Sequence, residues 1–371
     1  MSENRRMMNR MVLSNLRRRP VRSLIAAVAI AVEVALILMI VGLTNGMVRD
    51  NRTRMAGVGA DLVVRPQNSS MFFALGGNTL PLSLAALLAR QPGVKAVAPV
   101  ALQINNKSFD TISGIRLSSF DAVSGGFVFL HGGPFHKPYQ AIVDDLYARS
   151  HHAHVGQQLL LLGHEFQLTG IFEQGKGSRI YVPLATLNYL TGAPDKAAMI
   201  YIKLKNPAQT AAVLAQMRKL LPGYNIVPMK EFLSLFTASH MPGLPLFQHV
   251  MISIGVLVGF LVIFLSMYTT ILERTREIGI LKAMGASRAY IVEVILRESL
   301  GLALTGIVAG VAAAWLLREL LARAFPTLPV ELTLGWQAEA ALIAIVSSLI
   351  GAVYPAWKAA RQDPIAALAY E

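Results

Sequence analysis

The segment Ile271–Ser287, ILERTREIGILKAMGAS, decides the fold because it joins an apolar run to a charged segment that contains two glycines. Four charged residues follow the apolar run within five positions: Glu273, Arg274, Arg276 and Glu277. A membrane helix that ends in such charges extends past the lipid headgroups into water. Gly285-Ala286-Ser287 then predicts a helix stop, with Ser287 as the N-cap of the next helix. We therefore expect a short helix, a turn and a second helix that returns to the bilayer, within residues 273–298.

The composition predicts a membrane protein. The 371 residues have a mean hydropathy of +0.50, and only 15% are charged, which is too apolar for an ordinary soluble enzyme of this size. Runs of about twenty apolar residues can each cross a bilayer as a helix. The first run is longer than a signal-peptide core, so we interpret it as an uncleaved span. The expected spans are 23–48, 249–272, 299–321 and 338–357.

Basic residues beside the spans predict the orientation, because Lys and Arg accumulate on the cytoplasmic side. They precede the first span and follow the second and the fourth: Arg17, Arg18, Arg19, Arg22, Arg274, Arg276, Lys282, Lys358 and Arg361. Both termini, including the tail 358–371, are therefore expected in the cytoplasm, with residues 49–248 outside it. Within 1–22, Met8, Met11, Val12 and Leu16 have the spacing of an amphipathic helix along the inner interface.

The net charge of +13 indicates that the chain contacts an anionic partner. Residues 1–22 contain seven Arg and one Glu, which favours contact with anionic membrane lipid over binding of nucleic acid. The chain has no cysteine, so it can form neither a disulfide nor a thiolate metal site.

The exterior segment alternates short helices with strands, which predicts one or two compact α+β lobes. GADLVVRPQ reads as a strand, and SLAALLARQPGVKAVAPVALQI as a helix, a Pro-Gly break and a strand. The stretch that begins QAIVDDLYARS reads as a helix followed by a hairpin whose turn is Gly163-His164. From Lys230 an aromatic, proline-broken segment is expected to form a stalk to the membrane.

Several polar groups of the exterior invite a functional interpretation. His131, His136, His151, His152 and His154 could suggest a metal site, but the last three offer no i,i+4 pair, so we favour an exposed loop. The carboxylates of Asp144 and Asp145 are adjacent and point to different faces of a helix, so we interpret them as solvated helix charges. The chain has no G-x-x-x-x-G-K-[ST] phosphate loop, and GKGSR at Gly175 lies outside the cytoplasm.

Within the spans, Glu33 is a candidate intramembrane polar site, because an ionised carboxylate is costly there. We favour a protonated Glu33 bonded to a Ser or Thr inside the bundle over a functional relay. Small residues at four-residue spacing allow close helix approach, within one subunit or between two copies. They are Gly255 and Gly259, Gly306 and Gly310, and Ala27, Ala31 and Ala35.

Resemblance adds to this interpretation. ERTREIGILKAMGAS is similar to the signature of the MacB-like and FtsX-like permease family of ABC transporters. NLRRRPVRSLIAAVAIAV resembles the family's entry to its first span, and YPAWKAARQDPIAALAYE its C-terminal tail. QPGVKAVAPV and VGQQLLLLGHEFQLTGIFEQG resemble the MacB-like periplasmic core. The likeness covers nearly all of the chain, and it implies a four-span α-helical bundle, one plus three, with a large α+β extracytoplasmic domain between spans 1 and 2.

The resemblance implies that the segment after the second span is the coupling helix that binds an ATPase. The residues carried over are Glu273, Arg274, Arg276, Glu277, Gly279, Lys282, Met284 and Gly285. Ile278, Ile280, Leu281 and Met284 are too many apolar residues to leave in water, so we expect them in a groove of the partner. MacB-type members carry an N-terminal ATPase domain, whereas about 22 residues precede the first span here, so we expect the ATPase on a separate chain.

The resemblance further implies a permease of a bacterial inner membrane that is not itself an enzyme. It would pair with a second permease copy, identical or not, and with two ATPase copies, which bind ATP and Mg²⁺; this chain would bind no cofactor. Movement of the exterior domain would export or extract a substrate, with or without a periplasmic adaptor and an outer-membrane duct. Two alternatives are FtsX-type signalling to a cell-wall hydrolase and a membrane-anchored sensor or enzyme without an ATPase.

Overall fold

The computed structural model describes residues 20–67, 79–105, 110–235 and 243–363, and these fall into two compact units. The first, the bundle, contains the chain up to Asn45, Gly243–Leu321 and the chain from Val330. The second, the lobe, contains Gly46–Pro242 and Ala322–Pro329. The amphipathic helix predicted within 1–22 and the end of the tail 358–371 lie outside the described residues.

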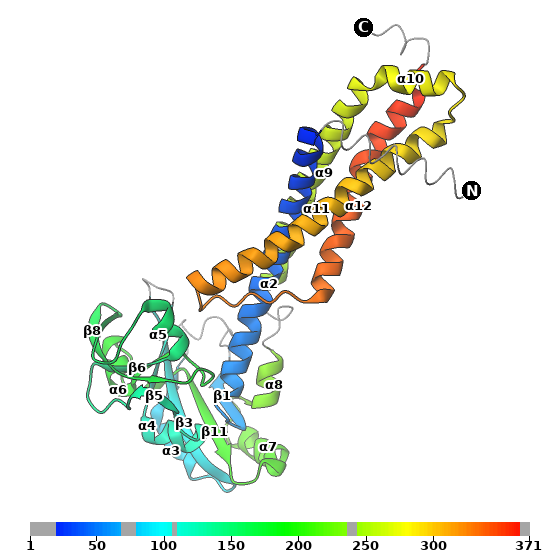
Figure 1. Cartoon of the computed structure of the whole chain (residues 1–371). Coiled ribbons are helices and arrows are strands. Elements are labelled where there is room, and N and C mark those ends of the chain that lie inside the picture. Colours follow the sequence, from blue (N-terminus) through cyan, green and yellow to red (C-terminus); the bar gives the residue numbers. More distant parts are fainter. Residues whose placement is uncertain (1–19, 68–78, 106–109, 236–242, 364–371) are drawn as a thin grey trace. The chain divides into compact units, whose positions relative to one another are not determined.

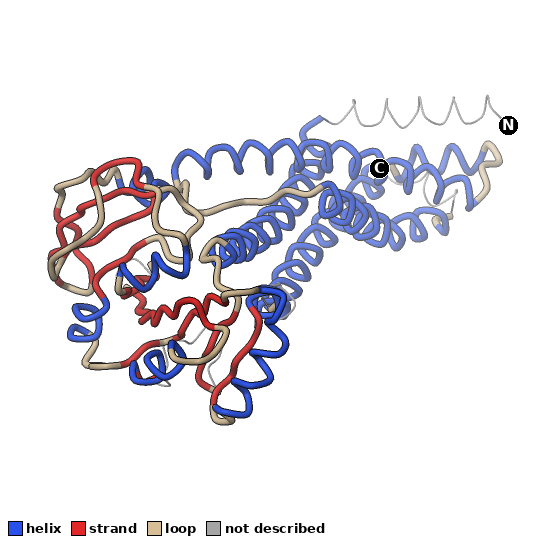
Figure 2. The backbone as a smooth tube through the Cα atoms, turned by 90° about the horizontal axis from the view of Figure 1, so that it is seen from below, coloured by secondary structure: helices blue, strands red, loops and turns tan. Residues whose placement is uncertain are grey.

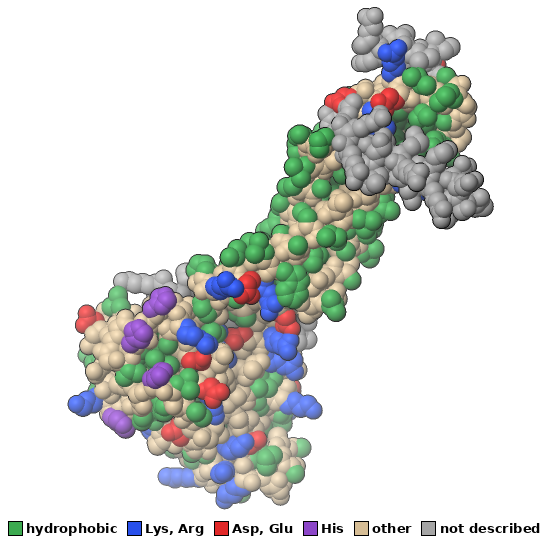
Figure 3. All heavy atoms as spheres, in the orientation of Figure 1, with side chains coloured by type: hydrophobic (Ala, Val, Ile, Leu, Met, Phe, Trp, Pro, Cys, Tyr) green, Lys and Arg blue, Asp and Glu red, His purple; other side chains and the backbone are tan. Residues whose placement is uncertain are grey.

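The described part of the bundle contains four long helices and one short one (Figure 1). Among the described residues four helices are long and apolar enough to cross a membrane, and the α/β lobe is inserted between the first and second of them, which confirms the predicted fold class. Figure 3 shows hydrophobic side chains over much of their visible surface, as a lipid-facing bundle requires. The bundle helices are α2 (Pro20–Ala56), α9 (Leu244–Glu273), α10 (Thr275–Ala283), α11 (Arg288–Ala324) and α12 (Leu334–Arg361).

Glycines of α11 allow that helix to pack closely against α2 of the same chain. A Cβ atom added at Gly306 would lie 2.6 Å from Ile30 Cβ and 2.8 Å from the carbonyl oxygen of Ala27. One added at Gly310 would lie 2.6 Å from the carbonyl oxygen of Ala31. Small residues that let backbones approach are typical of membrane helix pairs. Of the two explanations for this glycine spacing, packing within one subunit therefore accounts for Gly306 and Gly310.

The lobe is built on a ten-stranded mixed sheet of order β12-β1-β11-β3-β4-β9-β6-β8-β5, with β7 paired to β8. Figure 2 draws the strands in red. The β4–β9 and β6–β8 pairs are parallel and the others antiparallel, and β10 and β2 form a separate two-stranded sheet. The strands are β1 (Leu62–Pro66), β2 (Leu80–Pro81), β3 (Val94–Ile104), β4 (Thr111–Ile115), β5 (Phe129–Gly132), β6 (Gln140–Asp144), β7 (Gln158–Leu161), β8 (His164–Phe172), β9 (Ile180–Pro183), β10 (Lys196–Ala197), β11 (Met199–Leu204) and β12 (Tyr224–Pro228).

Hydrophobic cores form among the described residues of the lobe. One gathers around Phe166 and Leu168 of β8, and another around Leu62 of β1 and Ile202 of β11. The expected stalk begins inside the lobe, because Phe232 of α8 is 2% exposed and lies beneath Arg65. The lobe helices are α3 (Leu82–Ala89), α4 (Leu117–Ser124), α5 (Asp145–His151), α6 (Leu184–Leu190), the 3₁₀ helix η1 (Pro207–Gln209), α7 (Thr210–Leu220) and α8 (Met229–Ser234).

The prediction that Asp144 is a solvated helix charge is wrong. Asp144 ends the buried strand β6 and is 1% exposed; its carboxylate caps α5 by accepting from the Tyr147 N–H at 2.7 Å. Burial raises the pKa of Asp144, and the Arg179 guanidinium, 3.1 Å away, opposes that rise. Asp145 is only partly exposed and pairs with Arg149 at 2.9 Å. The β7–β8 turn is Leu162-Gly163, one residue earlier than predicted.

Charged groups attach the last turns of α2 to the sheet of the lobe. Arg179 pairs with Asp50 of α2 at 2.9 Å as well as with Asp144. Arg54 of α2 pairs with Asp50 at 2.9 Å and donates to the Gly177 carbonyl at 2.7 Å. Removing one partner of a buried pair costs about 3–5 kcal/mol, because the other charge is left buried. This α2 charge network, Asp50, Arg54, Asp144, Gly177 and Arg179, therefore fixes the end of α2 within the lobe.

Gly306→Ala tests the packing of α11 on α2. The added methyl would overlap Ile30, so we expect a loss of stability of about 1–3 kcal/mol, despite the better helix propensity of Ala. Gly255→Ala is the matched control, because Gly255 is also buried in a span but nothing lies within 4 Å of an added Cβ. Thermal unfolding of the detergent-solubilised chain measures both. Equal melting temperatures for the two variants would contradict the packing described here.

Candidate functional site

The segment after the second apolar helix forms the short helix, turn and return helix that the sequence predicts. Thr275 begins α10, and its hydroxyl bonds back to the Ile271 carbonyl at 3.1 Å, which ties α10 to the end of α9. Gly285 has φ of +97°, a left-handed conformation that ends the helix and that glycine adopts without strain. The Ser287 hydroxyl then accepts from the Tyr290 N–H at 3.2 Å at the start of α11.

Two basic side chains hold α10 against the neighbouring helices. Arg274 pairs with Glu277 at 2.9 Å and with Glu298 of α11 at 3.2 Å. Glu298 is only 6% exposed, so this ion pair is largely removed from solvent. Lys282 donates to the carbonyl oxygens of Ala360, at 3.0 Å, and of Gln362. These carbonyls at the end of α12 have no acceptor role within the helix, and a cation there is favourable. The short helix is thus attached to α9, α11 and α12.

The opposite side of α10 is exposed. Met284 is 72% exposed and Ile280 is 44% exposed, and the side chains of Arg276 and Glu277 flank them. Ile280 is four residues from Arg276, three from Glu277 and four from Met284, so Ile280 and Met284 lie on one face of the helix with the two charged residues at its edges. This surface, Arg276, Glu277, Ile280 and Met284, is here called the docking face. Charges at its edge and apolar side chains in its centre are the elements of a protein-binding surface.

The eight residues carried over from the family resemblance therefore divide into two groups. Glu273, Arg276, Glu277, Met284 and Gly285 are exposed, whereas Arg274, Gly279 and Lys282 are turned toward the bundle. The expectation that all four apolar side chains need a partner groove is wrong, because Ile278 is buried and Leu281 packs against the bundle core. Ile280 belongs to the docking face but is not among the eight. Its exposure depends on which side of α10 meets the bundle, and helical spacing alone does not fix that side.

Glu33 lies in the centre of the bundle and is 2% exposed. The Ser347 hydroxyl of α12 lies 3.2 Å from its Oε1, and 3.1 Å from the Ala344 carbonyl. A neutral carboxyl can donate to Ser347 while that hydroxyl donates to Ala344, which is the environment that our favoured interpretation requires. Among the described residues Oε2 has no hydrogen-bond partner. It occupies space left by a glycine of α9, where a Cβ on Gly259 would lie 1.8 Å away.

Other predicted polar groups do not assemble into a site. His131, His136, His151, His152 and His154 are exposed, and within the described ranges no three metal-ligating side chains gather. The GKGSR segment is a lobe loop in which Lys176 donates to the Ser124 carbonyl at 2.6 Å. It runs from strand β8 to strand β9, not into a helix whose N-terminus could receive a phosphate.

Comparisons with known proteins cover nearly the whole chain. The model of the MacB-like periplasmic core domain matches residues 23–220, and the model of the FtsX-like permease C-terminal region matches residues 249–364. The pyoverdine export ATP-binding/permease protein PvdT of Pseudomonas entomophila is 27% identical over 333 residues, 85% of this chain and 46% of PvdT. The macrolide export ATP-binding/permease protein MacB of Syntrophobacter fumaroxidans is 35% identical over 177 residues, 44% of this chain and 23% of that protein.

The matched region is thus less than half the length of each of these two relatives. Among solved structures, the periplasmic region of MacB from Actinobacillus actinomycetemcomitans is 15% identical and covers 48% of this chain and 93% of its own, with a TM-score of 0.37.

Glu33→Gln distinguishes a structural carboxyl from a functional one. The amide has the same shape and keeps a polar partner for Ser347, so we expect stability within about 1 kcal/mol of the wild type and unchanged ATP hydrolysis by the assembled complex. Gly259→Ala, which removes the space for Oε2, should cost about 1–3 kcal/mol. Thermal unfolding and phosphate release measure the two properties. A Glu33→Gln chain that folds normally but no longer supports ATP hydrolysis would show that the acid itself is required.

Proposed function

Because this chain belongs to the MacB-like and FtsX-like family of ABC transporter permeases, we propose that it converts ATP hydrolysis on an ATP-binding subunit into movement of its lobe. The proposal rests above all on the docking face, an exposed amphipathic surface on a helix that is attached to three spans. A soluble subunit that grips Ile280 and Met284 would bury apolar area, and Arg276 and Glu277 would set the register of the contact.

The attachment of α10 supports transmission of force. If the ATP-binding subunit shifts α10, the Arg274–Glu298 pair and the Lys282 bonds oppose a local displacement, so α9, α11 and α12 are expected to move with it. Close contacts of Gly306 and Gly310 then pass the displacement to α2. The α2 charge network fixes the end of the same helix in the lobe. In this mechanism, the substrate does not need to pass between the spans.

The assembly that we propose contains two permease copies, identical or not, and two ATP-binding subunits in a bacterial inner membrane. ATP and Mg²⁺ would bind to the latter, and α10 and both termini would lie in the cytoplasm. The relatives carry export names, for pyoverdine and for macrolides, and export by way of the extracytoplasmic lobe is the activity that we propose here. A periplasmic adaptor and an outer-membrane duct would complete an export route across two membranes.

Substitution of the docking face tests the coupling proposal. Ile280→Asp with Met284→Asp places two charges in the centre of the contact, and we expect the co-purified ATP-binding subunit to fall at least about thirtyfold, as for the loss of hot-spot residues. Leu220→Asp is the matched control, because Leu220 is 48% exposed on α7 of the lobe and should leave the complex intact. The chain would be purified from its native membrane, with bound proteins quantified by mass spectrometry and ATP hydrolysis measured on the complex.

Each result has a distinct meaning. Retention of the ATP-binding subunit by the double variant would refute the role of the docking face. Purification of the wild-type complex with a cell-wall hydrolase in place of export components would replace export by signalling. A wild-type chain without any associated ATP-binding protein or ATP hydrolysis would refute the coupling proposal and leave a membrane-anchored lobe.

A further inference from the structure

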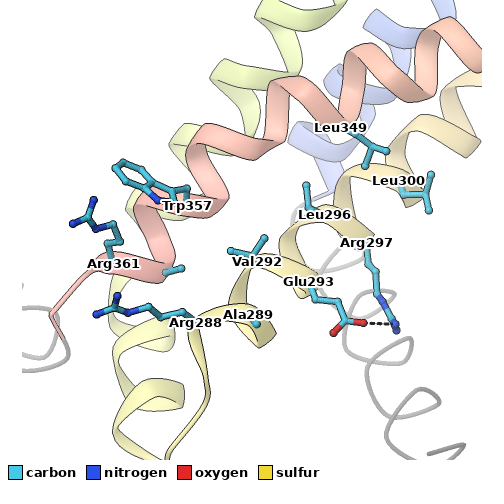
Figure 4. A pocket seen from close by; sticks show the side chains of 11 residues that line it. Arg288, Ala289, Val292, Glu293, Leu296, Arg297, Leu300, Leu349, Trp357 and Arg361 are labelled. Atoms are coloured by element: carbon cyan, nitrogen blue, oxygen red, sulfur yellow. Dashed lines mark hydrogen bonds and ion pairs between the residues drawn. The ribbon is translucent and has the colours of Figure 1, made fainter.

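A groove of about 610 Å³ lies within the bundle, between the start of α11 and the end of α12 (Figure 4). Figure 4 shows Arg288, Trp357 and Arg361 around one part of it and Leu296, Leu300 and Leu349 further along the two helices. Both helices leave the apolar region of the bundle here, since Arg288 begins α11 and Arg361 ends α12. The groove therefore combines a basic end with an apolar floor.

The polarity of the groove changes along the helix axes. At 1.5 Å per residue, Leu300 lies about 18 Å along α11 from Arg288, and Leu349 lies about 18 Å along α12 from Arg361. Trp357 is half exposed between these ends, and Trp is enriched where a membrane meets water. A groove that is basic and aromatic at one end and lined by leucines further along the helices has the polarity of a phospholipid headgroup followed by an acyl chain.

The charge of the basic end is not neutralised within the described chain. Glu293, the carboxylate of the groove, pairs with Arg297 at 2.5 Å. Arg361 lies over the ring of Trp357, with Cζ 4.6 Å from the centroid. No carboxylate of the described residues lies within ion-pair distance of Arg288 or Arg361. Two guanidinium groups are thus available to an anion, and arginine binds phosphate through paired N–H groups.

We propose that this groove binds one anionic phospholipid of the leaflet on the α10 side of the membrane. Its phosphate contacts Arg288 and Arg361, and an acyl chain lies along Leu296, Leu300 and Leu349. The basic segment 1–22, with seven Arg and one Glu, is a poor occupant because its charge has the same sign. A soluble subunit that contacts the basic end does not reach Leu300 and Leu349, which lie within the expected spans and about 18 Å along the helices from Arg288 and Arg361. The site does not depend on the proposed ATPase coupling.

Fluorescence quenching by brominated lipid tests the site. The chain has three tryptophans, so Trp315→Phe with Trp336→Phe leaves Trp357 as the reporter. This variant is reconstituted in vesicles of phosphatidylglycerol and phosphatidylcholine, in which either lipid carries bromine on its acyl chains. We expect brominated phosphatidylglycerol to quench Trp357 more strongly than brominated phosphatidylcholine at equal amounts. Arg288→Gln, which leaves the Arg361–Trp357 contact in place, should lower this preference about fivefold.

A second tryptophan, outside the groove, controls for general enrichment of one lipid around the whole chain. Trp315, kept alone by Trp336→Phe with Trp357→Phe, lies toward the other end of α11, is 44% exposed and also has an arginine, Arg318, over its ring. It lines no part of the groove, so both lipids should quench it equally. Native mass spectrometry of the wild-type chain gives a second measurement without tryptophan changes, in which phosphatidylglycerol should remain bound and Arg288→Gln should lose it.

The proposal is overturned if both lipids quench Trp357 equally, because the groove then sees only bulk lipid. It is also overturned if neither lipid quenches Trp357, since residues 1–19, a second copy of the chain or another subunit would then cover the groove. A preference for phosphatidylglycerol that is unchanged by Arg288→Gln and by Arg361→Gln would place the anion elsewhere.

Discussion

The ion pairs of Arg179 with Asp50 and Asp144 are the constraint on which the proposed mechanism depends, because they join a helix that belongs to both units to the sheet of the lobe. α2 runs unbroken from Pro20 to Ala56, and Arg54 adds a bond to the Gly177 carbonyl. A helix transmits displacement along its axis only if both of its ends are held. The lobe end of α2 is held, because the charges of its last turns are paired and largely excluded from water.

The other end of α2 is held by packing instead of by charge. Gly306 and Gly310 allow α11 to approach α2, and Glu33 of α2 contacts Ser347 of α12 and fills the space beside Gly259 of α9. Such contacts tolerate little rearrangement, because one added methyl group already overlaps backbone or side-chain atoms. A bundle packed in this way moves by small shifts of whole helices more readily than by local distortion. In the proposed mechanism, the attachment of α10 to α9, α11 and α12 would allow a soluble partner to produce such a shift.

Sequence periodicity predicted much of this architecture and missed its long-range contacts. The four apolar runs indicated the spans, but Arg49, Arg52 and Arg54 resembled the polar end of a span, so the extension of α2 to Ala56 was not foreseen. Asp144 resembled a solvated charge, because its partner Arg179 is 35 residues away and its strand is short. The charges and glycines after the second span predicted a short helix and a turn, whereas only the family resemblance suggested a role for them in ATPase coupling. Lys282 bonds to the end of α12 and Ile280 faces outward because of the way in which α10 packs on the bundle. No local sequence pattern encodes that packing.

The central claim is that α2 carries movement from the bundle to the lobe, and a distance measurement between the two units tests it most directly. The chain has no cysteine, so spin labels can be placed by Tyr189→Cys in the lobe and Leu334→Cys in the bundle, where both side chains are exposed. Double electron–electron resonance would compare the complex without nucleotide and after trapping with ATP and vanadate. The account predicts a shift in the distance distribution that is lost when Asp50→Asn and Arg54→Gln weaken the α2 charge network. A shift that persists unchanged in that variant, or no shift in the wild type, would contradict it.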